Sequence, residues 1–211
     1  MDNAVLHKIG YGLYILTARE GQRDNGCVID TFMQVTSDPT LIAAVALNKK
    51  HFSHEMILKT RKFNISVLAQ DAPFEVFEHF GYQSGSKVDK FAGYDNFARS
   101  ANGIAYLNEH VNAYMSCELV DAIDFGSHTL FKAAIVAGEV LSDAESITYA
   151  YYQRHVKPGP KELQESGYCC RVCCYVFEGE VLPEDFICPI CRHGVNEFVP
   201  LSSPEVLFCK S

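Results

Sequence analysis

Hydrophobic and polar residues alternate along much of the chain, which is the pattern of β-strands that bury one face. The alternation predicts strands over residues 10–17, 26–36, 40–47, 63–69, 113–125 and 128–141. The turn sequence SDP separates the second strand from the third, and Gly126 joins the two long strands that come last. Strands that are neighbours in the sequence are therefore expected to pair as hairpins.

Helical patterns are shorter and fewer. A helix is predicted over residues 54–62 with Ser53 as its cap, a second over residues 74–80 after Pro73, and a third over residues 146–154. No strand–helix–strand alternation runs through the chain. The pattern predicts a mainly β fold, an antiparallel barrel or sandwich with flanking helices.

A charged segment rich in proline and glycine, KPGPKELQESG, occupies residues 157–167 and has no apolar face. Such a segment is typical of a linker between domains. We expect a large domain over residues 1–156, a small domain over residues 168–201 and a tail over residues 202–211. The small domain is too short to bury a core of its own, so a metal ion is expected to stabilise it.

Six of the nine cysteines lie between residues 168 and 194, and four of them form two matched C-x-x-C pairs. The pairs are Cys170 with Cys173 and Cys188 with Cys191, and two such pairs make a tetrahedral four-sulfur site. Spacing alone favours a structural zinc ion, but a redox-active iron ion uses the same ligands. The clustering favours metal binding by free thiols over a disulfide framework.

The charge of the chain argues against a nucleic-acid partner, because the net charge is −8. Residues 161–211 carry four basic and eight acidic residues, a net charge of −4. This acidity suits transient docking on a basic protein surface, or it is only a solvated surface. Neither a secretory leader nor an apolar run of membrane-spanning length is evident, so the cytoplasm is the expected location and no membrane contact is expected.

Polar residues gather around two apolar strands between residues 25 and 54. No dinucleotide or P-loop glycine motif is present. Hydroxyl groups, the lysine pair Lys49 and Lys50 and the start of a helix are what a phosphate group requires. The alternative is a polar rim of the barrel with a helix cap.

Four segments resemble the flavin reductase-like family, whose fold is an FMN-binding split β-barrel. They are NGCVIDTFMQVTSDP, LNKKHFSHEMI, GSHTLFKAAIVAGEVL and TYAYY. The order of these segments is similar to the branch fused to a rubredoxin, the high-molecular-weight rubredoxins of anaerobes. CRVCCYVF and LPEDFICPIC likewise resemble the metal-binding knuckles of a rubredoxin-like module. The resemblance implies a split barrel followed by a rubredoxin-like four-cysteine module.

The resemblance implies two groups of contacts to FMN. One group lies along the predicted second strand and would hold the ring, the ribityl chain and the phosphate: Asn25, Cys27, Asp30, Thr31, Gln34, Thr36 and Ser37. The other group surrounds the first helix and would hold the phosphate: Asn48, Lys49, Ser53 and His54. His128 would face the open side of the flavin, where the nicotinamide stacks.

Four positions depart from the patterns of these families. Asp30 stands where asparagine is usual, and a carboxylate there would disfavour a negatively charged reduced flavin. Ser127 replaces an acidic residue before His128. Arg192 occupies the position of the second knuckle glycine, and Cys174 that of the first.

The combined resemblance favours iron over zinc, because a one-electron centre has a role beside a flavin. It implies transfer of electrons from NAD(P)H through FMN and iron to a redox partner such as a flavodiiron oxygen or nitric oxide reductase. A homodimer is also implied. The alternatives are a free-flavin reductase with a structural zinc ribbon, and a non-enzymatic FMN/iron electron carrier.

Overall fold

The computed structural model describes residues 8–158, 167–172, 175–189 and 192–203. The chain divides into two compact units, Met1–Val156 and Lys157–Ser211, and each is described separately. Among the described residues, none of the helices has the length and hydrophobicity that a membrane crossing requires.

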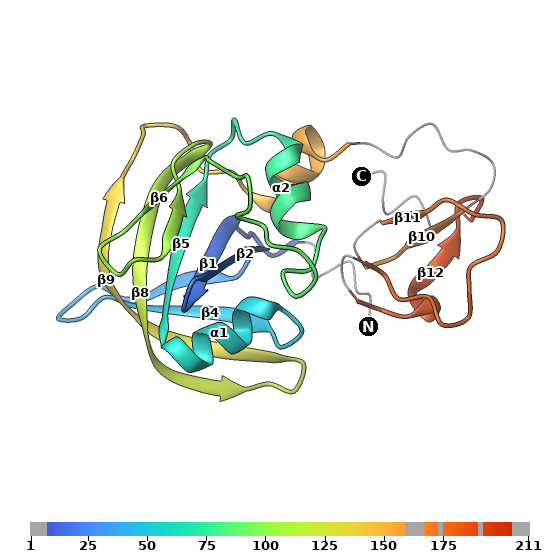
Figure 1. The fold of residues 1–211 in the computed structure, drawn as a ribbon. Helices are drawn as coiled ribbons and strands as arrows, with labels where there is room; N and C mark the ends of the chain where they lie inside the picture. The colour runs from blue at the N-terminus through green and yellow to red at the C-terminus, as the bar shows by residue number, and fades with distance from the viewer. Residues whose placement is uncertain (1–7, 159–166, 173–174, 190–191, 204–211) are drawn as a thin grey trace. The chain divides into compact units, whose positions relative to one another are not determined.

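The first unit is built on an antiparallel sheet of seven strands in the order β2-β1-β5-β8-β9-β4-β3 (Figure 1). Its strands are β1 (Tyr14–Glu20), β2 (Arg23–Ile29), β3 (Phe32–Thr36), β4 (Ile42–Asn48), β5 (Lys62–Leu68), β8 (Val111–Asp124) and β9 (His128–Val140). A separate hairpin pairs β6 (Phe97–Arg99) with β7 (Ala105–Leu107). The mainly β, antiparallel prediction is confirmed.

The helices of the first unit are short. They are α1 (Phe52–Thr60), α2 (Phe74–Gly81) and α3 (Tyr149–Tyr151), which continues as a π-helix over Tyr152–Val156. The predicted helix over residues 146–154 is therefore only partly α-helical. Helix α2 begins directly after Pro73, as expected from the fixed φ angle of proline at a helix start.

The predicted strand over residues 26–36 is wrong as a single element, because the chain forms two strands there. Strands β2 and β3 are the outermost strands at opposite edges of the sheet, and only Asp30 and Thr31 connect them. Three Cα–Cα steps from Ile29 to Phe32 span at most about 11 Å. The sheet must therefore curve until its two outer strands approach each other at this corner.

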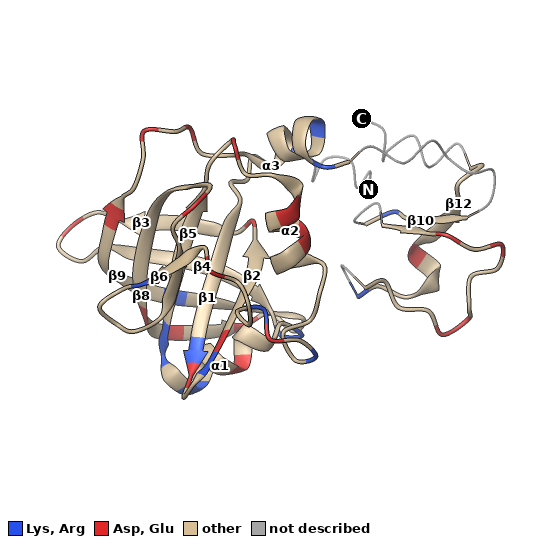
Figure 2. Ribbon diagram, turned by 45° about the horizontal axis from the view of Figure 1, so that its top comes forward, with Lys and Arg blue, Asp and Glu red and all other residues tan. Residues whose placement is uncertain are grey.

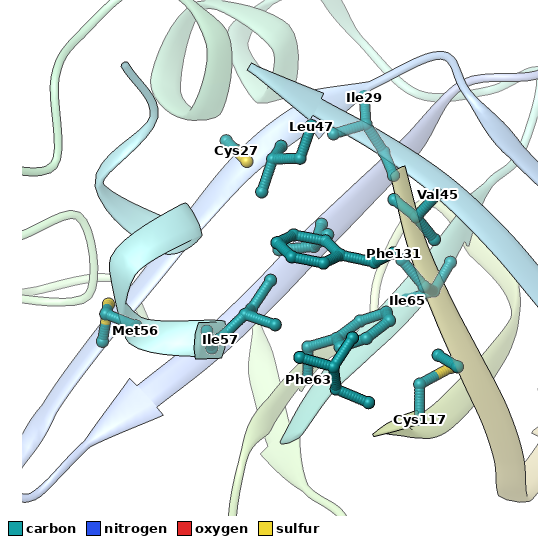
Figure 3. Close-up of a cluster of buried hydrophobic side chains, with 14 residues drawn as sticks. Cys27, Ile29, Val45, Leu47, Met56, Ile57, Phe63, Ile65, Cys117 and Phe131 are labelled. Atoms are coloured by element: carbon teal, nitrogen blue, oxygen red, sulfur yellow. The ribbon is translucent and has the colours of Figure 1, made fainter. Parts of the chain in front are cut away.

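The core of the first unit follows the alternation of the strands. In β4 the buried side chains are Ala43, Val45 and Leu47, at every second position. Phe63 from β5 and Phe131 from β9 lie fully buried in the same cluster, beside residues of β2 and α1 (Figure 3). A second cluster packs α2 against the sheet and against Tyr152. Burial of these apolar side chains is the main stabilising contribution to the unit.

Two further sequence predictions are corrected by the structure. The predicted strand over residues 10–17 begins at Tyr14 and continues to Glu20. Ser53 does not cap the first helix; His51 is the N-cap residue, without a side-chain cap hydrogen bond, and Ser53 is buried inside the helix. The local preference of serine for caps is overridden here because its hydroxyl finds a partner on β2.

The second unit contains a three-stranded sheet in the order β11-β10-β12. Its elements are β10 (Tyr168–Cys170), β11 (Val176–Phe177), a 3₁₀ helix (Val195–Glu197) and β12 (Phe198–Pro200). The rings of Tyr175, Phe177 and Phe198 lie around Phe186, with centroids 4.8–6.3 Å away from its own. Cys170 and Cys188 are buried in this aromatic cluster.

Arg192 has a φ angle of 63°, in the left-handed region that glycine adopts without strain. This agrees with its position in place of a knuckle glycine. Its N–H donates to the carbonyl oxygen of Cys188 at 3.0 Å, so the turn requires this conformation.

We predict that Arg192→Gly stabilises the second unit by about 1 kcal/mol, because the strain of a Cβ at positive φ is removed. Hydrogen exchange of the β10 and β12 amides in the full chain should then slow by about fivefold. Arg192→Ala is the matched control, since it shortens the side chain but keeps the Cβ, and should give no such gain. Faster exchange in the glycine variant would contradict the prediction.

Candidate functional site

Asn25, Cys27 and Ser53 form a buried group where β2 meets α1. Asn25 is 2% exposed, and its Nδ2 donates a hydrogen bond to Ser53 Oγ at 2.7 Å. Asn25 Oδ1 is buried and has no hydrogen-bond partner among the residues that the structure describes. Burial raises the pKa of the Cys27 thiol, so this cysteine is a neutral core residue. The orphaned amide oxygen is the feature that points to a missing polar partner.

His54 lies one residue further along α1 and faces β9. It is 6% exposed, its Nε2 lies 2.8 Å from Thr129 Oγ1, and its ring packs 5.4 Å from that of Phe131. Burial, with a smaller effect from the Lys49 ammonium, lowers the pKa of His54. A neutral imidazole that is bonded to a threonine fixes the start of α1 against the sheet.

Several residues of the predicted site that are not buried gather where β4 ends and β9 begins. Asn48 and His128 are direct partners across these strands. The Lys49 N–H donates to the Ser127 carbonyl oxygen at 3.0 Å, and Ser127 Oγ lies 2.8 Å from His128 Nδ1. The structure thus brings the lysine predicted for the phosphate and the histidine predicted for the nicotinamide side onto one corner.

Lys49 also forms an ion pair that the sequence did not reveal. Its Nζ donates to both carboxylate oxygens of Asp124, at 2.6 and 2.7 Å. The hydrogen bond from Lys49, followed by one from the Gly126 N–H, lowers the pKa of Asp124. The two residues are 75 positions apart, so only the β8–β9 turn brings them together. Charged residues of both signs gather at this end of the unit, near α1 (Figure 2).

The start of α1 is suited to an anion. No side chain caps the first turn of the helix, where the His54 N–H donates to the His51 carbonyl at 3.0 Å, so the positive dipole end of the helix has no side-chain oxygen beside it. Lys49 lies three residues before the helix begins, and Asn48 Oδ1 accepts from the Lys50 N–H at 2.9 Å, which holds the connecting turn. A helix start with a lysine close before it makes a donor set that fits a phosphate.

The remaining predicted residues lie on or next to β3 and bond mainly to their own neighbours. Thr31 Oγ1 donates to Asp30 Oδ1 at 2.8 Å, and Gln34 Nε2 donates to the Thr36 carbonyl at 3.2 Å. Thr36 Oγ1 donates to the carbonyl of Thr40, and Ser37 is exposed. The structure therefore leaves this group along the outer edge of the sheet, separate from the buried group.

Lys90 is a buried residue of this region that the sequence analysis missed. It is 3% exposed, and its Nζ donates to the Gly26 carbonyl at 2.8 Å and to the Phe80 carbonyl at 2.7 Å. Burial lowers the pKa of Lys90 to about 8. Nothing in its local sequence signals burial, because the residues on its N-terminal side, from Ser86 to Asp89, are all exposed.

Side chains alternate between the two faces of β10, so the neighbouring cysteines Cys169 and Cys170 pack in different clusters. Cys170 is fully buried in one cluster with Cys188, while Cys169 packs in another cluster with Leu201. The Cys170 N–H donates to the Tyr175 carbonyl and the Cys188 N–H to the His193 carbonyl, both at 2.8 Å. The predicted ligands Cys173 and Cys191 lie outside the described residues.

The family described as "Flavin reductase like domain" matches residues 6–160. The chain therefore belongs to the flavin reductase-like family, a class of flavin-dependent oxidoreductases. Its mainly β fold is also similar to an FMN-binding protein from Thermus thermophilus, with a TM-score of 0.58 and 27% identity over 64% of this chain and 73% of that one.

Two relatives differ in how much of the chain they cover. The chain is 39% identical to a high molecular weight rubredoxin of Moorella thermoacetica, over 94% of this chain and 99% of the relative. It is 38% identical to a ferric-chelate reductase (NAD(P)H) of Archaeoglobus fulgidus, over 72% of this chain and 89% of the relative. The first similarity extends into the cysteine-rich unit, and the resemblance to flavin reductase-like proteins fused to a rubredoxin is confirmed.

We predict that Cys188→Ser abolishes metal binding by the full chain, whereas Cys169→Ala keeps it, because only Cys188 shares a cluster with Cys170. The measurement is iron and zinc content of protein purified without oxygen. The alanine variant is the control for a change of a buried cysteine in the same unit. Loss of metal in the Cys169 variant with retention in the Cys188 variant would mean that the ligand register is wrong.

Proposed function

We infer that the chain is an FMN-dependent NAD(P)H oxidoreductase that passes electrons to a four-cysteine iron centre and then to a redox partner protein. The observation that carries this inference is the similarity over 94% of the chain to a relative named as a rubredoxin, in a chain whose first unit belongs to the flavin reductase-like family. A flavodiiron protein is the partner that we favour. The acidic surface of the second unit supports docking on a basic partner.

The flavin phosphate is proposed to bind at the start of α1. The uncapped N–H groups of the first turn and the Lys49 ammonium supply donors there, and Asn48 orders the turn between them. Ser53 and His54 are buried, so they support the helix start from inside and do not reach a ligand through solvent.

The ring is proposed to lie along the segment from Asn25 to Thr31, beside the buried Asn25 amide. The unpartnered Oδ1 of Asn25 supports a polar group at this position. Asp30, Thr31, Gln34, Thr36 and Ser37 would meet the rest of the cofactor from the sheet edge. Bound FMN would supply hydride acceptance from a nicotinamide and release of single electrons.

His128 is proposed as the catalytic residue on the nicotinamide side. It is exposed at the same corner as Lys49, and Ser127 lies within hydrogen-bond distance of its Nδ1. That contact orients the imidazole ring, so its Nε2 is the atom that would meet a substrate. The imidazole would orient the nicotinamide or exchange a proton with it.

The metal is proposed to be iron, held by Cys170, Cys173, Cys188 and Cys191. The aromatic side chains around Cys170 and Cys188 would limit water access, which tunes the potential of an iron–thiolate centre. A structural zinc ion would transfer no electrons, so it would not need a shell that tunes its potential. The free thiols suit a reducing compartment, so we place the protein in the cytoplasm.

A homodimer is proposed from the apolar surface of the first unit. Met33 and Val35 on the outer strand β3 are 60% and 55% exposed, and Phe125 in the β8–β9 turn is 64% exposed. Large apolar side chains of this kind are normally covered by a partner surface. A second subunit would bury them and shield the edge of β3.

A free-flavin reductase with a structural zinc ribbon is the second candidate. It is favoured by the Archaeoglobus fulgidus relative, of which 89% is matched within 72% of this chain. Because that reductase is matched over most of its own length by only part of this chain, it supports reductase activity without the second unit. A non-enzymatic carrier is the third candidate, and it would not oxidise NADH or NADPH.

The deciding experiment is a visible spectrum, a metal analysis and an NADH and NADPH oxidation assay on full-length protein purified without oxygen. We expect one FMN and one iron ion per chain, with iron reduced only when FMN is present. Zinc in place of iron would support the free-flavin reductase. Absence of nucleotide oxidation in FMN-loaded protein would exclude both enzyme candidates.

We predict that Lys49→Ala weakens FMN binding by about 1–3 kcal/mol, the scale of a lost charge-assisted hydrogen bond. Riboflavin, which lacks the phosphate, should bind the variant as it binds the unsubstituted chain. Calorimetry on flavin-free protein measures both dissociation constants. Lys50→Ala is the matched control, and an equal loss in that variant, or a loss of riboflavin affinity, would remove Lys49 from the phosphate site.

A further inference from the structure

Lys90 connects three elements of the first unit from a buried position. Its ammonium donates to the carbonyl of Gly26 on β2 and to the carbonyl of Phe80 near the end of α2. His79 Nε2 donates a hydrogen bond to the Lys90 carbonyl oxygen at 2.6 Å, which fixes the main chain of the loop. Strand β2 is an outer strand of the sheet, so Lys90 also covers part of an otherwise open edge.

The buried ammonium of Lys90 has no negatively charged partner among the described residues, since no carboxylate there lies within ion-pair distance of its Nζ. The titratable side chain that interacts with its charge is Cys27, and burial raises the pKa of that thiol, which favours its neutral form. Burial of an unpaired ammonium is costly, and carbonyl dipoles offset only part of that cost.

A neutral side chain would protect the edge of β2 at lower cost. Glutamine, for example, offers two N–H donors for the same two carbonyls without a charge. The retained charge therefore calls for an explanation beyond hydrogen bonding. The position of Lys90 supplies one, because Gly26 lies within the segment from Asn25 to Thr31.

We propose that Lys90 is a positioning residue of the flavin site whose buried positive charge favours the reduced, more negative form of bound FMN over the oxidised form. This inference rests on the proposed function. Transfer of a hydride, with its electron pair, from nicotinamide to the oxidised ring adds one negative charge unless a proton follows. A fixed cation beside β2 stabilises that added charge, as charges near a flavin ring do in general.

The expected size of the effect follows from the length of the segment along which the ring is proposed to lie. Asp30, near the far end of that segment, is four residue steps from Gly26, or about 13 Å along the chain. At an effective dielectric constant of about 20, a unit charge at that distance changes the preference between the two redox states by about tenfold. Asp30 is exposed and its opposing charge is screened by water, whereas Lys90 is buried.

The test compares the dissociation constants of oxidised and two-electron reduced FMN, which is equivalent to measuring the shift of the midpoint potential on binding. Lys90→Met removes the charge and the hydrogen bonds, and Lys90→Gln removes the charge while keeping donors for both carbonyls. Both are measured in the full chain, after circular dichroism has established that the variant is folded. We expect each to lower the preference for reduced FMN by about tenfold.

Lys87→Met is the matched control, because Lys87 is an exposed lysine of the same loop. It removes the same charge from the surface and should change the preference by less than twofold. Riboflavin should respond to the Lys90 variants as FMN does, which separates the effect from that of Lys49 on the phosphate.

Three outcomes would overturn the inference. An unchanged preference in both Lys90 variants would show that the charge is not felt by the flavin. A change in the methionine variant alone, or an equal weakening of both redox states, would assign Lys90 a purely structural role. An unsubstituted chain that binds no FMN in either redox state would instead refute the proposed function, and this inference with it.

Discussion

The short connection through Asp30 and Thr31 is the constraint on which the first unit depends. It joins the two outer strands of a seven-stranded sheet, and its length forces the sheet to curve. The curvature encloses a core in which Phe63 and Phe131 are fully buried. It also places the polar segment that follows β2 at the corner where the sheet edges meet. The same short connection therefore shapes both the fold and the proposed cofactor site.

Two buried polar side chains from other elements bond to β2. The Asn25 amide bonds to Ser53 of α1, and the Lys90 ammonium bonds to Gly26. Such groups lower stability unless their hydrogen-bonding capacity is used. The Asn25 amide oxygen has no hydrogen-bond partner among the described residues, and the Lys90 ammonium has no carboxylate partner there. Both groups lie at β2, which is why the flavin ring is proposed to lie near this strand.

The second unit depends on a different principle, because its three short strands bury few apolar side chains. Cys170 and Cys188 share one aromatic cluster, and metal–thiolate bonds contribute folding free energy in modules of this size. The alternation of β10 turns Cys169 to the opposite cluster. One residue of register therefore decides which of the two thiols shares a cluster with Cys188.

The sequence by itself determined the antiparallel, mainly β class, the paired cysteines and the polar cluster around the first helix. Each is a local pattern, and period-two alternation or C-x-x-C spacing is visible within a few residues. Even the two long strands were predictable to within two residues at each end. The break at Asp30 was not, because a turn of two ordinary polar residues carries no glycine or proline signal. Only the tertiary structure decided that Ser53 is buried against Asn25, that Lys49 pairs with Asp124, and that Lys90 lies inside. These contacts join residues 28 to 75 positions apart, and the burial of a side chain depends on which distant strand lies against it, which no local pattern encodes.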